Sequence, residues 1–99
     1  MIISIGPSPR QGKRFRVIWQ YEHGGKKAFD FSIPGANTYI DGASEQTRNA
    51  YRRRHLANPN ERMKIENFIP SPALFSFWIT WGETRSISKN IKILNELMD

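Results

Sequence analysis

The sequence contains no cysteine among its 99 residues. Disulfide bonds, thiolate metal sites and cysteine nucleophiles are therefore excluded, which is typical of proteins that fold in a reducing compartment. Only two histidines, His23 and His55, titrate near neutral pH without a large shift in pKa. Neither lies in a catalytic-triad or zinc-ligand spacing, and no glycine-rich phosphate-binding loop is present. We therefore expect no enzyme activity, no catalytic residue, no metal and no cofactor.

Long apolar runs are also missing. The longest apolar-rich stretch, residues 73–81, is far shorter than the roughly 20 residues that span a bilayer. The first residues lack the charged start and long apolar centre of a signal peptide. We expect a protein made in the cytosol, without a transmembrane segment. The hydrophobic fraction of 38% and the aromatic fraction of 12% suffice for one core, so residues 1–99 are predicted to form a single domain.

The first part of the chain has the alternating pattern of β-strands. Apolar and polar residues alternate over residues 14–21 and again over residues 28–33, and a glycine-containing turn at residues 23–26 separates the two runs. These features predict a β-hairpin. Residues 2–5 form a further predicted strand, which the following Gly-Pro pair should end. Residues 39–40 are predicted to be one more short strand.

The second part has the signals of helices. Capping residues precede four helical segments, which are predicted over Ser44 to Leu56, Asn60 to Ile65, Ser71 to Trp81 and Ser86 to Met98. Gly82 occupies the position of a glycine that ends a helix. The last segment has an apolar stripe of Ile87, Ile91, Leu94 and Met98, backed by Leu97. The predicted fold is α+β, with a small antiparallel sheet formed around the N-terminal hairpin and covered by three to four C-terminal helices; residues 1–42 are mainly β and residues 43–99 mainly α.

Positive charge is concentrated in the first two-thirds of the chain. The net charge is +6, and residues 1–64 contain 12 of the 15 Lys and Arg but only 5 of the 9 Asp and Glu. This excess predicts an anionic partner, which is a nucleic acid, an acidic protein face or lipid headgroups. The alternative is that the charge serves only solubility.

Two clusters contribute most of this charge: a first cluster of Arg10, Lys13, Arg14 and Arg16, and a second cluster of Arg48, Arg52, Arg53 and Arg54. In a helix Arg48 and Arg52 lie four residues apart on one face, where like charges repel unless an anion neutralises them. Phosphates or an acidic protein face would do so. The alternative is that Glu45 offsets one of the two and the face is simply solvated. The predicted partner or phosphate contacts are Arg14, Arg16, Arg48, Arg52 and Arg53.

Aromatic residues are the second candidate for contact with a partner. Trp78 and Trp81 are three residues apart, so they lean the same way on an apolar helix and are predicted either to fill the core or to dock. The aromatic residues of the first predicted strand alternate with its arginines and therefore face the core. The sequence has no helix-turn-helix, zinc-finger or RNA-recognition signature, so any binding to nucleic acid would be sequence-independent.

Several segments between residues 39 and 90 resemble a known family. They are residues 38–42 (Thr-Tyr-Ile-Asp-Gly), 51–56 (Tyr-Arg-Arg-Arg-His-Leu), 70–76, 78–82 and 86–91. The resemblance is to short uncharacterised proteins of large nucleocytoplasmic double-stranded DNA viruses, and its specific parts are the Tyr-x-x-Arg-His step and the Trp-x-x-Trp helix. It supplies no catalytic residue.

The resemblance implies a viral setting for this chain. We expect a virion structural protein, a minor capsid component that binds other virion proteins, located in the virion and, during assembly, in the host cytoplasm. The alternative is a sequence-nonspecific nucleic-acid-binding protein.

Overall fold

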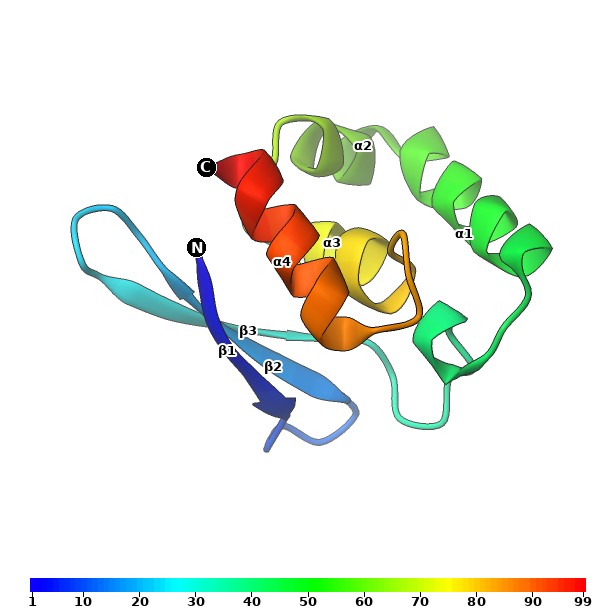
Figure 1. Ribbon diagram of the computed structural model, residues 1–99, viewed down its shortest axis with the longest axis horizontal. Helices are drawn as coiled ribbons and strands as arrows, with labels where there is room; N and C mark the ends of the chain where they lie inside the picture. Colours follow the sequence, from blue (N-terminus) through cyan, green and yellow to red (C-terminus); the bar gives the residue numbers. More distant parts are fainter.

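The computed structural model describes all residues from 1 to 99. Three strands, β1 (Ile2–Pro7), β2 (Phe15–Gln20) and β3 (Lys26–Phe31), form an antiparallel sheet in the order β1-β2-β3. The helices are α1 (Glu45–Ala57), α2 (Pro59–Glu66), α3 (Pro72–Phe75) and α4 (Ile87–Met98), with a 3₁₀ turn η1 (Tyr39–Asp41) and a π-helical segment η2 (Ser76–Thr80). The predicted α+β fold is confirmed, and the helices lie together on one side of the sheet (Figure 1).

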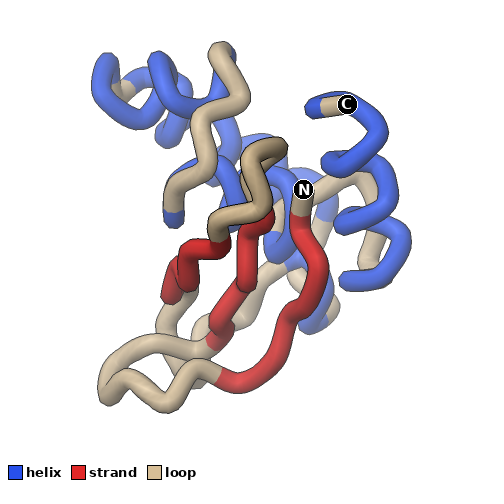
Figure 2. The backbone as a smooth tube through the Cα atoms, turned by 90° about the vertical axis from the view of Figure 1, so that its left-hand side faces the viewer, coloured by secondary structure: helices blue, strands red, loops and turns tan.

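The hairpin of β2 and β3 has the predicted alternation. Val17 lies opposite Phe29 and Phe15 opposite Phe31, so apolar side chains meet on one face of the sheet. Val17 and Phe31 are fully buried there. The turn closes where the Tyr21 N–H donates to the Gly25 carbonyl at 2.8 Å. Seen from the side, the strands lie together and the helices are stacked beyond them (Figure 2). This arrangement places the helices over the apolar face.

Phe75 at the end of α3 is the centre of the core. Its ring centroid lies 5.4 Å from that of Phe29, 6.0 Å from Phe31 and 6.2 Å from Trp19. Leu94 of α4 is fully buried in the same cluster. The core therefore joins strands from the first half of the chain to helices from the second half.

The structure corrects two predictions in the first half. β1 continues through Gly6 to Pro7, because it is an edge strand in which a proline is tolerated where its missing N–H would face outward. The strand predicted at residues 39–40 is wrong. These residues belong to η1, where the Asp41 carboxylate accepts hydrogen bonds from the N–H and the hydroxyl of Thr38.

The predicted helix starts at Ser44, Ser71 and Ser86 are confirmed, since each hydroxyl accepts a backbone N–H three residues on. The second helix begins two residues earlier than predicted: its cap is Asn58 rather than Asn60, and Pro59 is its first residue, because proline suits the first helical turn.

The helix predicted from Ser71 to Trp81 changes to a π-helix halfway along. The Ser76 carbonyl accepts both the Trp81 N–H and the Thr80 hydroxyl, which widens the turn. Gly82 follows it and is required for space rather than for a left-handed backbone, because a Cβ there would overlap the Trp78 carbonyl.

On α4, Leu97 is 49% exposed and does not back the apolar stripe as predicted. At about 100° per residue it lies beside the stripe, roughly 90° around the helix from its centre, where it borders solvent. None of the helices is long and apolar enough to cross a membrane.

Candidate binding surface

The inner face of α1 is held to the molecule by aromatic and polar contacts. The Tyr51 ring stacks on Trp81 with centroids 4.2 Å apart and ring planes 16° apart. Burial raises the pKa of the Tyr51 hydroxyl above its ordinary value. One turn on, His55 lies against Tyr51, and its Nδ1 is 2.5 Å from an oxygen of Glu61 in α2. The Tyr-x-x-Arg-His step thus packs directly on the Trp-x-x-Trp segment.

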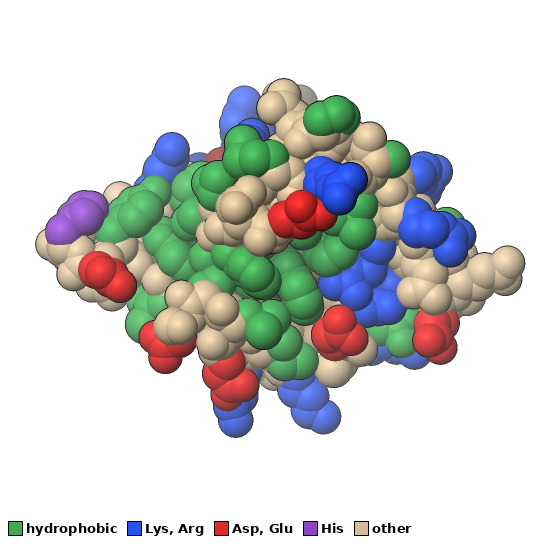
Figure 3. Space-filling model, turned by 90° about the horizontal axis from the view of Figure 1, so that it is seen from above, with side chains coloured by type: hydrophobic (Ala, Val, Ile, Leu, Met, Phe, Trp, Pro, Cys, Tyr) green, Lys and Arg blue, Asp and Glu red, His purple; other side chains and the backbone are tan.

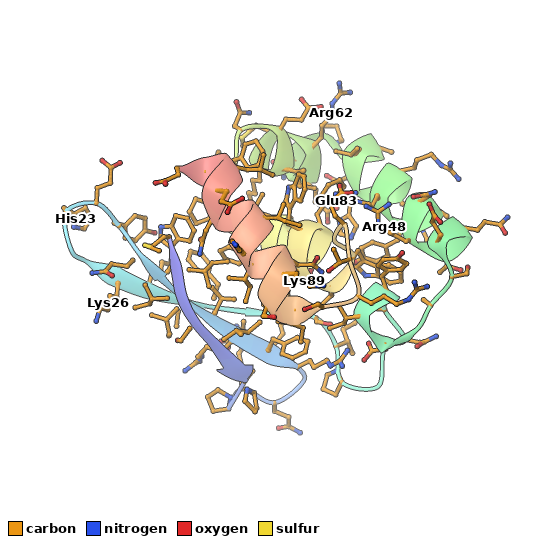
Figure 4. The ribbon with its side chains drawn as sticks, in the orientation of Figure 1. His23, Lys26, Arg48, Arg62, Glu83 and Lys89 are labelled. Carbon is orange, nitrogen blue, oxygen red and sulfur yellow. The ribbon has the colours of Figure 1, made fainter.

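Arg48 and Arg52 complete this inner face. The Arg48 Nε–H donates to the Gly82 carbonyl at 2.6 Å, and the Arg52 guanidinium lies 3.9 Å from the centroid of Phe77. Both arginines reach the carboxylate of Glu83, at 3.4 and 3.3 Å respectively, and Figure 4 shows Glu83 beside Arg48. Burial, and then the charge of Arg48, lower the pKa of Arg52.

The predicted repulsion between these two arginines is therefore relieved within the fold. The neutralising group is Glu83, from the loop before α4, and not Glu45, which pairs with no cation. Because Glu83 lies more than 30 residues along the chain, no local spacing could have identified it. Both arginines are committed to holding α1 in place.

In the first cluster Arg14 and Arg16 are also paired internally. Arg14 donates two hydrogen bonds of 2.6 Å to Asp41, and the pKa of that carboxyl is held well below its ordinary range. Arg16 binds Asp30 on the neighbouring strand at 2.8 and 3.0 Å, and this contact, with a hydrogen bond from Ser8, lowers the pKa of Asp30 to about 2. The hairpin register places Arg16 opposite Asp30. The predicted alternation had put both residues on the polar face of the hairpin but did not give this register.

The outer face of α1 presents unpaired positive charge. Arg53 and Arg54 are exposed, and neither has a carboxylate within 4 Å. They border a shallow groove along the helix that is also lined by Gln46, Thr47, Ala50 and Ala57. Of the five predicted contact residues only Arg53 belongs to this outer face. Its neighbour Arg54 was not predicted, although both adjacent arginines are exposed.

Of the two predicted docking tryptophans, one is buried and the other is half-buried. Trp81 is only 7% exposed. Trp78 is half-buried between Phe68, whose centroid is 6.1 Å away, and the Arg52 guanidinium at 5.0 Å. Both tryptophans support the inner face of α1 and do not present a free aromatic surface.

The histidines do not form a catalytic or metal-binding group. His23 lies exposed at the hairpin turn, where its Nδ1 accepts the Gly25 N–H at 3.1 Å and its ring stacks on Tyr21 (Figure 4). His55 lies on the other side of the molecule beside Glu61. The structure contains no group of three or more His, Asp or Glu side chains able to hold a metal ion. The expectation that the protein is not an enzyme stays a prediction.

Comparison with known proteins gives two matches. A family model described as a family of unknown function, DUF5754, matches residues 3–55. The chain is also 34% identical over 80 residues to "Uncharacterized protein L851" of Acanthamoeba polyphaga mimivirus, which covers 80% of each chain. No solved structure matches.

These matches bear on the predicted resemblance. An uncharacterised family with a viral member is confirmed. The family match, however, includes the hairpin and ends at residue 55, whereas the resemblance was placed on residues 39–90.

Proposed function

The chain belongs to the family of unknown function DUF5754, and we propose that it is a virion structural protein, a minor capsid component that binds acidic faces of neighbouring virion proteins. The observation that carries this proposal is the division of α1 into a tied inner face and a free basic outer face with Arg53 and Arg54. The mimivirus relative supports a viral setting.

The distribution of unpaired charge favours a protein partner over a nucleic acid. Ten of the fifteen basic side chains have no carboxylate within 4 Å: Arg10, Lys13, Lys26, Lys27, Arg53, Arg54, Lys64, Arg85, Lys89 and Lys92. They belong to several separate elements, and on the face seen in Figure 3 basic groups stand apart around a central hydrophobic area. A nucleic-acid groove combines a continuous basic track with exposed aromatic rings. Here Trp19 and Trp81 are buried, and Trp78 is half-buried between Phe68 and Arg52.

An arginine-bearing helix face suits a protein interface. Arginine is enriched at such interfaces because its planar fork of donors pairs with carboxylates. The small Ala50 and Ala57 let a partner approach the helix between the two arginines. The partner surface is therefore acidic and narrow enough to lie along α1.

The first test is the location of the protein in virions. Virions are purified from infected host cells, washed with nuclease and high salt, and analysed by quantitative mass spectrometry. We expect a constant ratio of this protein to the major capsid protein. A photo-crosslinking residue at position 50, on the outer face of α1, should capture a capsid protein, whereas one at the exposed Ala28 of β3 should not. Detection only in infected-cell extract contradicts the proposal.

The second test addresses nucleic acid, which is the second candidate. Anisotropy of a 30-base-pair DNA is measured from low to physiological salt with the wild-type protein, with Arg53→Ala/Arg54→Ala and with Lys89→Ala/Lys92→Ala, a control of equal charge change on α4. We expect weak binding that both double variants reduce alike. Binding that falls steeply with salt and is lost only in the α1 variant would replace the capsid proposal by sequence-neutral nucleic-acid binding.

A further inference from the structure

A groove of about 700 Å³ lies between β1 and the first half of α4. Its apolar walls consist of isoleucines from β1, from η1 and from α4: Ile2, Ile3, Ile5, Ile40, Ile87 and Ile91. Arg14, Asp41 and Arg85 stand in the same groove. The groove thus combines an apolar wall with charged groups.

One wall of the groove is an open sheet edge. β1 pairs with β2 alone, so its other side has no neighbouring strand. At Ile2 the side-chain amide of Asn95 occupies that side: it accepts the Ile2 N–H at 2.9 Å and donates to the Ile2 carbonyl at 3.1 Å. The register of β1 shifts at a bulge between Ile2 and Ser4, so Ile5 opposite Val17 has the same backbone orientation as Ile2 opposite Trp19. The backbone groups of Ile5 therefore also point outward, into the groove.

The polar groups of the groove carry net positive charge. Arg14 is neutralised by Asp41 at 2.6 Å. Arg85 has no carboxylate within 4 Å; it donates to the Ala43 carbonyl at 3.0 Å and lies 4.2 Å from the Tyr39 ring centroid, which holds it in place. Two arginines and one carboxylate leave one uncompensated charge beside the isoleucines. An acidic ligand complements it.

We propose that an extended acidic segment of a partner protein binds in this groove. Its backbone pairs with the outward N–H and carbonyl of Ile5, an apolar side chain enters among the isoleucines, and a carboxylate reaches Arg85. Strand addition to an open edge gives affinity through main-chain hydrogen bonds and specificity through side-chain pockets. A second copy of β1 does not fit this chemistry, because residues 1–10 contain no carboxylate and end in Arg10.

This groove is distinct from the outer face of α1. The proposal goes beyond the capsid role and shares with it only the assumption that the partner is a protein. Either one can fail while the other stands.

The test selects ligands without prior choice of sequence. A phage library of random decapeptides is panned on the full-length protein, and enriched peptides are synthesised for titration by anisotropy. We expect peptides that combine alternating apolar residues with Asp or Glu. Exchanging the acids for Asn or Gln, or methylating alternate backbone nitrogens, should each weaken binding at least about tenfold.

Matched variants locate the site. Ile3 in the groove is 42% exposed and Ile69 outside it is 39% exposed, so both tolerate a polar substitution equally well. Ile3→Asp and Arg85→Ala should each weaken the peptides at least about tenfold, whereas Ile69→Asp and Arg53→Ala/Arg54→Ala should change affinity less than about twofold. Thermal melts confirm that each variant is folded.

Several outcomes overturn the proposal. They are a library that yields no enriched peptide, peptides without acids, and affinity retained in Ile3→Asp. Concentration-dependent dimers of the wild-type protein that Ile3→Asp dissociates would assign the edge to a second copy instead. The Arg53→Ala/Arg54→Ala variant changes the outer face of α1 and leaves the groove intact. A negative result for the capsid proposal on α1 can therefore be distinguished from a negative result for peptide binding in the groove.

Discussion

Helices α1 and α4 are nearly equal in length, with 13 and 12 residues, but they are attached to the molecule in different ways. α4 buries an apolar stripe in the core, and Leu94 is fully buried. α1 buries no residue completely. It is held by the stacking of Tyr51 on Trp81 and by two arginines that share Glu83. One helix depends on the hydrophobic effect and the other on a few directed contacts.

The difference explains which charges are free to act. The apolar stripe of α4 requires no charged residue. The inner face of α1, by contrast, pairs Arg48 and Arg52 with Glu83, and Arg53 and Arg54 stay exposed. A cluster of basic residues in a sequence is therefore a mixture of structural and available charges. The helix face on which each residue lies decides between the two.

The largest expected loss of stability comes from weakening the apolar packing of α4 in the core. Leu94→Ala removes a fully buried side chain from the core and should lower the free energy of unfolding by about 2–5 kcal/mol, because lost burial and a cavity add together. Urea unfolding followed by circular dichroism measures the change. Leu97→Ala, on the same helix but 49% exposed, is the control and should cost less than about 1 kcal/mol. Equal losses would show that α4 is not anchored by its stripe.

The contacts that hold α1 should contribute less to stability than the core packing of α4, and their contribution should depend on individual side chains. Arg52→Ala removes the contacts with Glu83 and Phe77 and should lower the free energy of unfolding by about 1–2 kcal/mol. Arg53→Ala, the adjacent exposed residue, should stay within about 0.5 kcal/mol of wild type. Urea unfolding of both variants checks this.

A third variant separates charge from packing. Arg52→Met keeps an unbranched stem against Phe77 and removes a buried charge that Arg48 repels. It should lose less stability than Arg52→Ala, because replacing a buried ion by an apolar side chain of similar size is often neutral. A loss equal to that of Arg52→Ala would mean that the charge, rather than the stem, holds α1.

Local signals in the sequence predicted the elements well. The serine caps at 44, 71 and 86 are short-range features, and so is the alternation that placed Val17 and Phe31 in the core. Each depends on residues within one turn or one strand, so the sequence alone contains it. The α+β class follows from the order of these elements.

Side-chain pairing depended on long-range geometry and was not predicted. Glu83 reaches Arg48 and Arg52 only because η2 and α1 pack together, and Asp41 reaches Arg14 across 27 residues. Reading Arg14, Arg16, Arg48 and Arg52 as free charges therefore overestimated the basic surface. The groove at β1 was also missed, since its isoleucines come from three separate segments.

Both α1 and α4 begin with a capping serine, so removing each serine compares the two helices through a smaller change in stability. Ser44→Ala removes the acceptor of the Thr47 N–H in α1, and Ser86→Ala removes that of the Lys89 N–H in α4. Each should cost about 1 kcal/mol. In native-state hydrogen exchange, Ser44→Ala should speed exchange of α1 amides alone, because a helix without buried apolar side chains opens locally. Exchange of α1 only through global unfolding would remove the contrast with α4.

The smallest effect concerns the ion pairs beside the sheet, which are partly exposed and therefore weak. Asp30 has a pKa of about 2 in the folded protein, lowered from 3.8 mainly by its hydrogen bonds with Arg16 and Ser8, and the pKa of Asp41 is also lowered, mainly by Arg14. Between the folded-state pKa of Asp30, about 2, and its unfolded value of 3.8, the unfolded chain binds more protons than the folded one. Stability therefore falls as the pH falls through this range. The contribution of Asp30 is complete above about pH 4 and lost toward pH 2.

The measurement is the thermal midpoint between pH 5 and pH 2. Asp30→Asn should lower the midpoint slightly at pH 5 and make its fall toward pH 2 shallower, because the variant no longer takes up that proton on unfolding. Glu45→Gln, which changes an unpaired carboxylate on α1, is the control and should leave the slope as in wild type. If both variants gave the wild-type slope, the pair of Arg16 and Asp30 would contribute nothing to stability. The arginine would then count as available charge, as Arg53 does.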